Sequence, residues 1–206
     1  MKRLHTIFAL AALLFCTSLP MRAQVLQNAY FTIDWQVGIP VGTSFADKAS
    51  GWGMNFEGGY YILPQLAVGG FFNYQTNLRK VGRETLALSP TTALTTKQKH
   101  AVFQIPFGVT SRWLFLTEGI AQPYVGLKLG PNYSQFSSYY YIVQRSVDRW
   151  GFYLSPEVGV NIYPNPQRRY GFHVAAYYSY ATNRGDLMVY HIDGLNNSGF
   201  RFGVVF

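Results

Sequence analysis

The sequence predicts an all-β protein, an eight-stranded antiparallel up-and-down transmembrane β-barrel that follows an N-terminal signal peptide. Three observations lead to this fold class. The chain of 206 residues is poor in charge and rich in aromatic residues, eight segments alternate between apolar and polar positions, and the mid-segment charges all lie on one face. This combination is typical of strands that separate lipid from a polar barrel interior.

The composition argues against a soluble domain, a disordered tail or a coiled coil. Charged residues make up 13% of the chain and hydrophobic residues 49%, whereas soluble domains carry about 25% charged residues. The 16 Tyr, 16 Phe and 20 Gly favour strands and tight turns over helices. We therefore expect much of the surface to face something other than water.

Residues 1–23 have the three parts of an export signal. These parts are the basic residues Lys2 and Arg3, the apolar run 7–16, and the small residue Ala23 before the expected cleavage point. We expect residues 24–206 to form a single barrel domain. Because the only cysteine, Cys16, falls within the signal, the mature chain is predicted to have no disulfide and no cysteine metal ligand.

Four segments in the first half of the mature chain alternate with period two, the repeat of a strand with two different faces. In the first, Phe31 and Trp35 share a face opposite Asp34. The second ends at Pro64, and the third begins directly after it. The four segments cover 31–39, 52–62, 66–75 and 101–110.

Four further segments complete the predicted barrel. The fifth is short, with Val125 and Leu129 on the apolar face and Lys128 on the other. The eighth closes the chain and places Arg201 opposite its aromatic residues. The four segments cover 125–130, 152–162, 172–180 and 199–206.

The connections between these segments alternate in length. The short ones are 63–65, 114–122 and 163–169, and the long ones are 40–51, 76–99, 134–149 and 182–197. Seven connections join eight strands and leave both ends of the chain on the side of the short turns. Short periplasmic turns and long outer loops are the pattern of outer-membrane barrels, so we expect the long connections to be loops outside the cell.

The position of charge decides which face meets lipid, because a soluble lipocalin-like barrel would alternate in the same way with its apolar face inside. A Lys or Arg facing lipid at the membrane midplane would cost about 2–4 kcal/mol, so the charged face is predicted to line the interior. Five charges lie five or six positions from the short-turn ends: Asp34, Glu57, Lys128, Glu157 and Arg201. We expect them to form an interior polar network. A catalytic or proton-relay site is the alternative.

Aromatic residues near the strand ends are expected to form girdles at the two membrane interfaces. On the short-turn side these are Tyr60, Tyr61, Trp113, Tyr124, Tyr163 and Phe206, and on the long-loop side they are Trp52, Tyr74, Tyr133, Trp150 and Tyr180.

The last eight residues place aromatic side chains at alternate positions and end on Phe206. In this the chain resembles the small outer-membrane β-barrel family of OmpA/OmpX-type, porin-like proteins. The resemblance implies an outer-membrane location in a Gram-negative bacterium. It also implies that Phe206, with Phe202 and Val204, is the signal read by the barrel-assembly machinery.

Motifs for catalysis, metals or cofactors are weak. His100, His173 and His191 have no neighbouring histidine at ligand spacing, and we expect no cofactor and no enzymatic activity. The strongest enzyme alternative is a lipid A deacylase, whose barrel resembles this chain and carries His and Ser at the rim. Here His191 and Ser198 are the candidates, although they are farther apart than in that motif.

The long connections contain basic and aromatic residues that suit an anionic or glycan partner. The candidate contacts are Arg79, Lys80, Arg83, Tyr139, Tyr140 and Tyr141. We therefore expect a monomer with a structural or surface-interaction role. Its expected partners are outer-membrane lipid and lipopolysaccharide, with an extracellular protein or glycan as a further candidate, but not nucleic acid. A lipid A-modifying enzyme and a narrow channel for small solutes are the alternatives, since eight strands leave little free interior.

Overall fold

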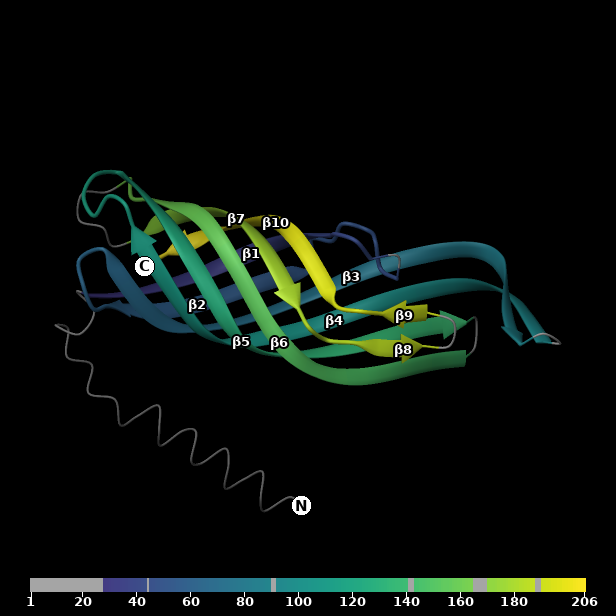
Figure 1. Ribbon diagram of the computed structural model, residues 1–206. Coiled ribbons are helices and arrows are strands. Elements are labelled where there is room, and N and C mark those ends of the chain that lie inside the picture. Colours follow the sequence, from purple (N-terminus) through teal and green to yellow (C-terminus); the bar gives the residue numbers. More distant parts are fainter. Residues whose placement is uncertain (1–27, 44, 90–91, 141–142, 165–169, 188–189) are drawn as a thin grey trace, which may run out of the picture.

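A computed structural model describes residues 28–43, 45–89, 92–140, 143–164, 170–187 and 190–206 (Figure 1). The predicted signal peptide lies outside these residues. Within them, no helix is long and apolar enough to cross a membrane.

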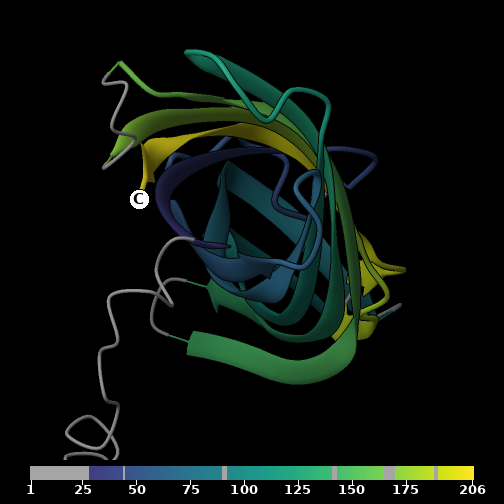
Figure 2. The same ribbon diagram turned by 90° about the vertical axis from the view of Figure 1, so that its left-hand side faces the viewer.

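Eight strands of the described chain close into one antiparallel ring, which confirms the predicted fold class. The ring follows the order β1-β10-β7-β6-β5-β4-β3-β2, and β8 and β9 form a separate hairpin. Figure 2 shows the ring from the end at which the chain terminates. The strands are β1 (Ala29–Pro40), β2 (Gly53–Tyr61), β3 (Leu66–Ser89), β4 (Thr92–Leu114), β5 (Ala121–Tyr140), β6 (Val143–Ile162), β7 (Gly171–Ala181), β8 (Gly185–Leu187), β9 (Tyr190–Ile192) and β10 (Leu195–Val205).

The two faces of the barrel strands differ as the alternation predicts. In β1, Phe31 and Trp35 are 44% and 53% exposed, whereas Asp34 is fully buried. The same division continues around the ring, where exposed aromatic and aliphatic side chains form an apolar outer band. An apolar outer band around a polar interior is the surface of a barrel that spans a lipid bilayer.

The predicted loops 76–99 and 134–149 are mostly strand, which corrects the sequence interpretation. β3 and β4 remain paired as far as Ser89 and Thr92, and β5 and β6 remain paired as far as Tyr140 and Val143. Both hairpins extend past the rest of the barrel (Figure 1); we call this the outer end. Strands beyond the membrane meet water on more than one side, so apolar alternation fades although backbone pairing continues.

The other two long connections also contain ordered structure. Segment 182–197 includes the β8–β9 hairpin and the first residues of β10. In segment 40–51, Phe45 and Ala46 are buried, at 2% and 1% exposure. Apolar side chains in both connections therefore fold inward rather than remain in solvent.

Glycines on the inner face make room for large side chains in a narrow barrel. A Cβ atom at Gly59 would lie 2.6 Å from the Tyr30 ring, and one at Gly159 would lie 2.7 Å from the Tyr124 ring. Each tyrosine thus fills the space that a side chain on the neighbouring strand would need. This packing explains part of the high glycine content.

Three residues assigned to the short-turn girdle turn toward the barrel interior instead. One of them, Tyr61, packs against buried Tyr30, with the ring centroids 5.5 Å apart. Tyr124 is fully buried and Tyr163 is 8% exposed, in contact with a small cluster around Tyr30 and Val205. Tyr124 has the same parity as Lys128 in β5, and this parity, rather than nearness to the strand end, sets its direction. Outward aromatic residues remain at both ends, including Trp113 and Trp150.

Candidate functional site

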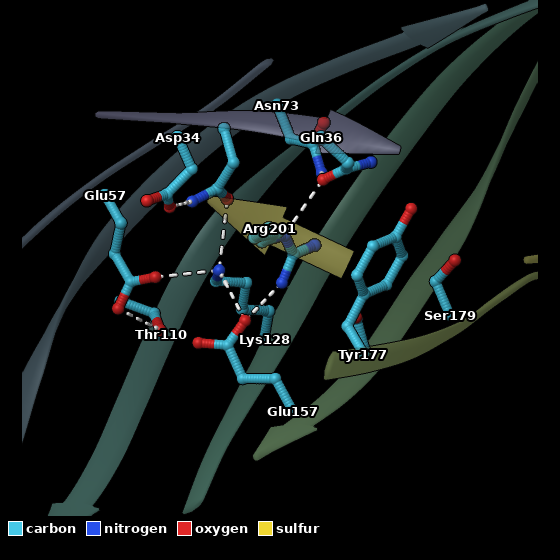
Figure 3. A network of polar contacts seen from close by, with 12 residues as sticks. Asp34, Gln36, Glu57, Asn73, Thr110, Lys128, Glu157, Tyr177, Ser179 and Arg201 are labelled. Carbon is cyan, nitrogen blue, oxygen red and sulfur yellow. Dashed lines mark hydrogen bonds and ion pairs between the residues drawn. The ribbon is translucent and has the colours of Figure 1, made fainter. Parts of the chain in front are cut away.

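The structure brings the five predicted interior charges into the barrel lumen, and all are at most 2% exposed. Lys128 lies at the centre (Figure 3). Its Nζ is 2.7 Å from Glu57 Oε2 and 2.9 Å from Glu157 Oε2, and it donates to Asn55 Oδ1 at 3.0 Å. One ammonium group therefore joins carboxylates from β2 and β6.

Arg112 is a sixth charge that the sequence analysis missed. Its Nε is 2.5 Å from Glu57 Oε1, and its guanidinium lies between the rings of Tyr30 and Tyr124, at 4.7 and 4.5 Å. With Arg112 the lumen holds three carboxylates and three basic side chains, so their formal charges cancel. Its inward parity in β4 was the available signal, but its place near the strand end lay outside the expected layer.

Arg201 links this centre to the seam between the first and last strands. Its guanidinium pairs with Glu157, its Nε donates to Gln36 Oε1 at 2.9 Å, and it lies 4.1 Å from the centroid of the Tyr177 ring. The seam itself is the antiparallel pairing of β1 with β10. A side chain from the last strand thus contacts both the first strand and β6.

Asp34 lies in the same lumen but pairs with a different partner. His173 Nδ1 donates to Asp34 Oδ1 at 2.6 Å, and Asn55 donates to Asp34 Oδ2 at 2.8 Å. His173 Nε2 is 2.6 Å from the Tyr124 hydroxyl, which is 3.0 Å from Glu157 Oε1. All of these side chains are shielded from solvent, an arrangement that suits a structural network more than contact with a substrate.

An apolar cluster closes the lumen on the outer side of the charges. It begins at Phe71, whose ring centroid is 6.0 Å from Lys128 Nζ, and includes Phe45 from the 40–51 connection. We call it the mouth cluster: Phe45, Ala46, Phe71, Val102, Phe136, Tyr153, Ala181, Leu187, Ile192 and Leu195. His100 packs against it, 4.9 Å from Phe45, and bonds to Ser138 at 2.7 Å.

The six predicted surface contacts divide into different environments, and those described are in strands rather than loops. Lys80 and Arg83 in β3 and Tyr139 in β5 are exposed. Arg79 Nε is 3.8 Å from Asp47 Oδ1, and Tyr140 is buried at 4% exposure. Tyr141 lies outside the described residues. Successive side chains of these extended strands point to opposite faces, so neighbours such as Arg79 and Lys80, or Tyr139 and Tyr140, have different environments. The sequence did not predict strands in these segments.

No hydrogen bond joins the two deacylase candidates, His191 and Ser198, both of which are among the described residues. Outside the barrel wall, the imidazole of His191 donates from Nδ1 to Asp186 and from Nε2 to Asp193, the latter at 3.0 Å. The Asp186 hydrogen bond and the charge of Asp193 raise the pKa of His191. Ser198 lies in β10 opposite residues of β1 and β7. The described residues hold no cluster of His, Cys, Asp and Glu suited to a metal ion.

The proposed assembly signal lies on the outward face of the closing strand. Phe202 and Phe206 are 44% and 53% exposed, and Val204 is half-buried. The backbone of Phe206 exchanges hydrogen bonds with Phe31, at 2.9 and 3.1 Å. The terminal residue therefore takes part in ring closure.

This chain is similar to solved structures of bacterial surface and outer-membrane proteins. Neisserial surface protein A is 15% identical over 86% of this chain and 95% of its own, with a TM-score of 0.55. Outer membrane protein W of E. coli is 17% identical over 87% and 97%, with a TM-score of 0.45. OprG from Pseudomonas aeruginosa is 14% identical over 86% and 94%, with a TM-score of 0.46.

No match was found among curated proteins. The family described as the outer membrane protein beta-barrel domain matches residues 8–206. With the closed ring, the apolar outer band and this match over nearly the whole sequence, the chain belongs to that family and is a β-barrel protein of the Gram-negative outer membrane.

Proposed function

We propose that this barrel has a structural or surface-interaction role and presents the outer ends of β3–β6 to partners outside the membrane. The observation that carries the proposal is a lumen filled at two levels, by the charge network and by the mouth cluster. Function is then expected at the outer surface rather than along a path through the barrel.

The filled lumen argues against the narrow-channel alternative. Eight strands enclose a space just wide enough for side chains or one small ligand, and here Lys128, Arg112 and Arg201 occupy it with their carboxylate partners. Opening a path would require several buried ion pairs to separate at once. We therefore expect no steady ion conductance in planar bilayers.

The projecting hairpins support the surface role. β3 has 24 residues, whereas about 9–11 suffice to cross a bilayer. From Arg79 to Ser89, the described part of β3 pairs with β4 alone. The other edge offers backbone donors and acceptors to a partner. Exposed cations nearby favour an anionic partner such as lipopolysaccharide, and an extracellular protein or glycan is the further candidate.

Comparison of a deletion strain with its parent tests this role. We expect the deletion to reduce whole-cell binding to immobilised host proteins or glycans and to leave the lipid A mass spectrum unchanged. A matched strain carries a shortened hairpin, with residues 84–96 replaced by Asn-Gly, a favoured two-residue hairpin turn. Altered lipid A acylation would support the enzyme alternative, and parental binding by both strains would contradict the surface role.

A further inference from the structure

Four cations form a compact group on the β3–β4 hairpin. Lys80 lies directly opposite Lys99, and Arg83 lies directly opposite Lys97. Directly opposite residues in an antiparallel pair have Cβ atoms about 4.5–5.5 Å apart. All four side chains are exposed. We call these four residues the hairpin cation cluster.

A β-bulge places all four cations on the outward face. Even-numbered residues of β3 face outward, as exposed Phe72 shows, and Lys80 continues this series. The register shifts between Val81 and Arg83, so that Gly82 is an extra residue and Arg83 returns to the face of Lys80. Without the shift, Arg83 would point to the opposite face.

The chain does not neutralise this cluster. Like charges directly opposite each other destabilise a strand pair, and the cluster contains two such pairs. All nine acidic residues of the chain are among the described residues, and none forms an ion pair with a cluster member. Glu84, next along β3, lies opposite Thr96. An external anion would relieve the repulsion.

The cluster stands beyond the aromatic row of the outer end. On the same face, Tyr74 lies in β3, and the rings of Tyr133 and Trp150 are 5.4 Å apart on β5 and β6. Such rows mark the membrane interface. Lys80 follows Tyr74 by about six residues, which is about 20 Å along the strand and about 15 Å along the membrane normal at the usual strand tilt.

We infer that the hairpin cation cluster binds phosphate groups on the sugars of lipopolysaccharide in the outer leaflet. The cations face sideways, toward the sugar layer that surrounds the barrel, and Lys and Arg form charge-assisted hydrogen bonds with phosphate. Lys99 Nζ also lies 5.9 Å from the centroid of the exposed Tyr139 ring. The inference rests on the proposed function, because it names the ligand of the same projecting hairpin.

The test uses the refolded mature barrel in neutral detergent, titrated with lipopolysaccharide and with lipopolysaccharide that has been enzymatically dephosphorylated. A variant with Lys80, Arg83, Lys97 and Lys99 changed to Gln should bind intact lipopolysaccharide more than tenfold more weakly than the parent. The control removes the same charge from exposed residues at the same end, through Lys48→Gln, Arg145→Gln, Arg149→Gln and Arg184→Gln, and should change affinity less than twofold. Dephosphorylation should weaken binding to the parent by a similar factor.

The unfolding temperature shows whether the cluster variant is folded as well as the parent. Without lipopolysaccharide, the cluster variant should unfold at a temperature no lower than the parent, because its repulsive pairs are gone. Parental affinity in the cluster variant, or an equal loss in the control variant, would overturn the inference. So would equally tight binding of inorganic pyrophosphate, which would assign the site to free phosphate.

The hairpin shortened between residues 84 and 96 separates this inference from the proposed function. It keeps the cation cluster but lacks the projecting tip. Lipopolysaccharide binding by this variant should equal that of the parent. If it does so while whole-cell binding is unchanged both in the shortened-hairpin strain and in the deletion strain, the phosphate site stands and the surface role fails.

Discussion

Replacement of Lys128 by Met tests whether the lumen charges form one structural network. The change keeps an apolar chain of similar length but removes the ammonium group between Glu57 and Glu157. Loss of one partner from a buried ion pair costs about 3–5 kcal/mol. With a guanidinium m value of about 4 kcal/mol/M, a loss of about 4 kcal/mol lowers the unfolding midpoint by about 1 M.

The charge balance of the lumen also predicts how a double variant behaves. Lys128→Met leaves three carboxylates with the cations Arg112 and Arg201. A second change, Glu57→Gln, restores formal neutrality and keeps an acceptor oxygen for Arg112, whose Nε lies 2.5 Å from Glu57 Oε1. The double variant should therefore regain more than half of the lost stability, even though it has fewer ion pairs than the single variant.

Denaturant unfolding in detergent micelles, followed by tryptophan fluorescence, measures these effects. Lys48→Met at an exposed position is the control, and we expect it to change the free energy of unfolding by less than about 0.5 kcal/mol. A Lys128→Met protein within about 1 kcal/mol of the parent would refute the buried network. A double variant less stable than the single one would refute the charge-balance argument.

Three other predictions follow from the structure. Gly159→Val should destabilise the barrel by about 1–3 kcal/mol in thermal unfolding, because the valine side chain would overlap the buried Tyr124 ring. Gly82→Val is the control and should have little effect, because a side chain at position 82 would meet open space. Asp186 and Asp193 raise the pKa of His191 in the folded β8–β9 hairpin. The stabilisation of the hairpin by these ion pairs should therefore be complete below about pH 6.5, the pKa of an unperturbed histidine. It should be lost as the pH rises through the raised pKa of the folded state. The protection factors of the β8–β9 amides, which are corrected for the intrinsic pH dependence of hydrogen exchange, should fall over this range in the parent but not in His191→Gln. An epitope at Gly194 should be labelled on intact cells and one at Gly119 should not; the reverse result would invert the orientation.

The barrel wall is the part of the fold that the sequence predicts well. In β1, Phe31 and Trp35 face outward toward lipid, and Asp34 faces the polar lumen. Because successive residues of a strand point to opposite faces, apolar and polar residues alternate with a period of two. The outer halves of β3 and β5 do not carry this alternation. There, backbone pairing continues without a lipid face, and residues such as Thr85 and Ser137 give no alternation of hydropathy.

The site is predictable in its composition but not in its connections. Parity and height along the strand place Glu57, Lys128 and Glu157 together, because strands of a closed ring bring equal heights to one layer. Arg112 escapes this reasoning, since its long side chain reaches the layer from the end of its strand. Arg79 and Lys80 point to opposite faces of β3 because the strand pairing continues far outside the lipid band. In that region the sequence shows no alternation of apolar and polar residues that would predict the pairing.

The seam between β1 and β10 also has a kinetic consequence. Neighbouring hairpins can form from nearby residues, but Arg201 and Gln36, which bond across the seam, are 165 residues apart. Contacts this distant in sequence pay the largest loop-closure entropy and form late. Until they form, Asp34 of β1 lacks its His173 partner from β7, which is 139 residues away, and the half-built ring exposes a charged concave face. Closure of the wall therefore also completes the polar network of the lumen, when the last strand pairs with the first.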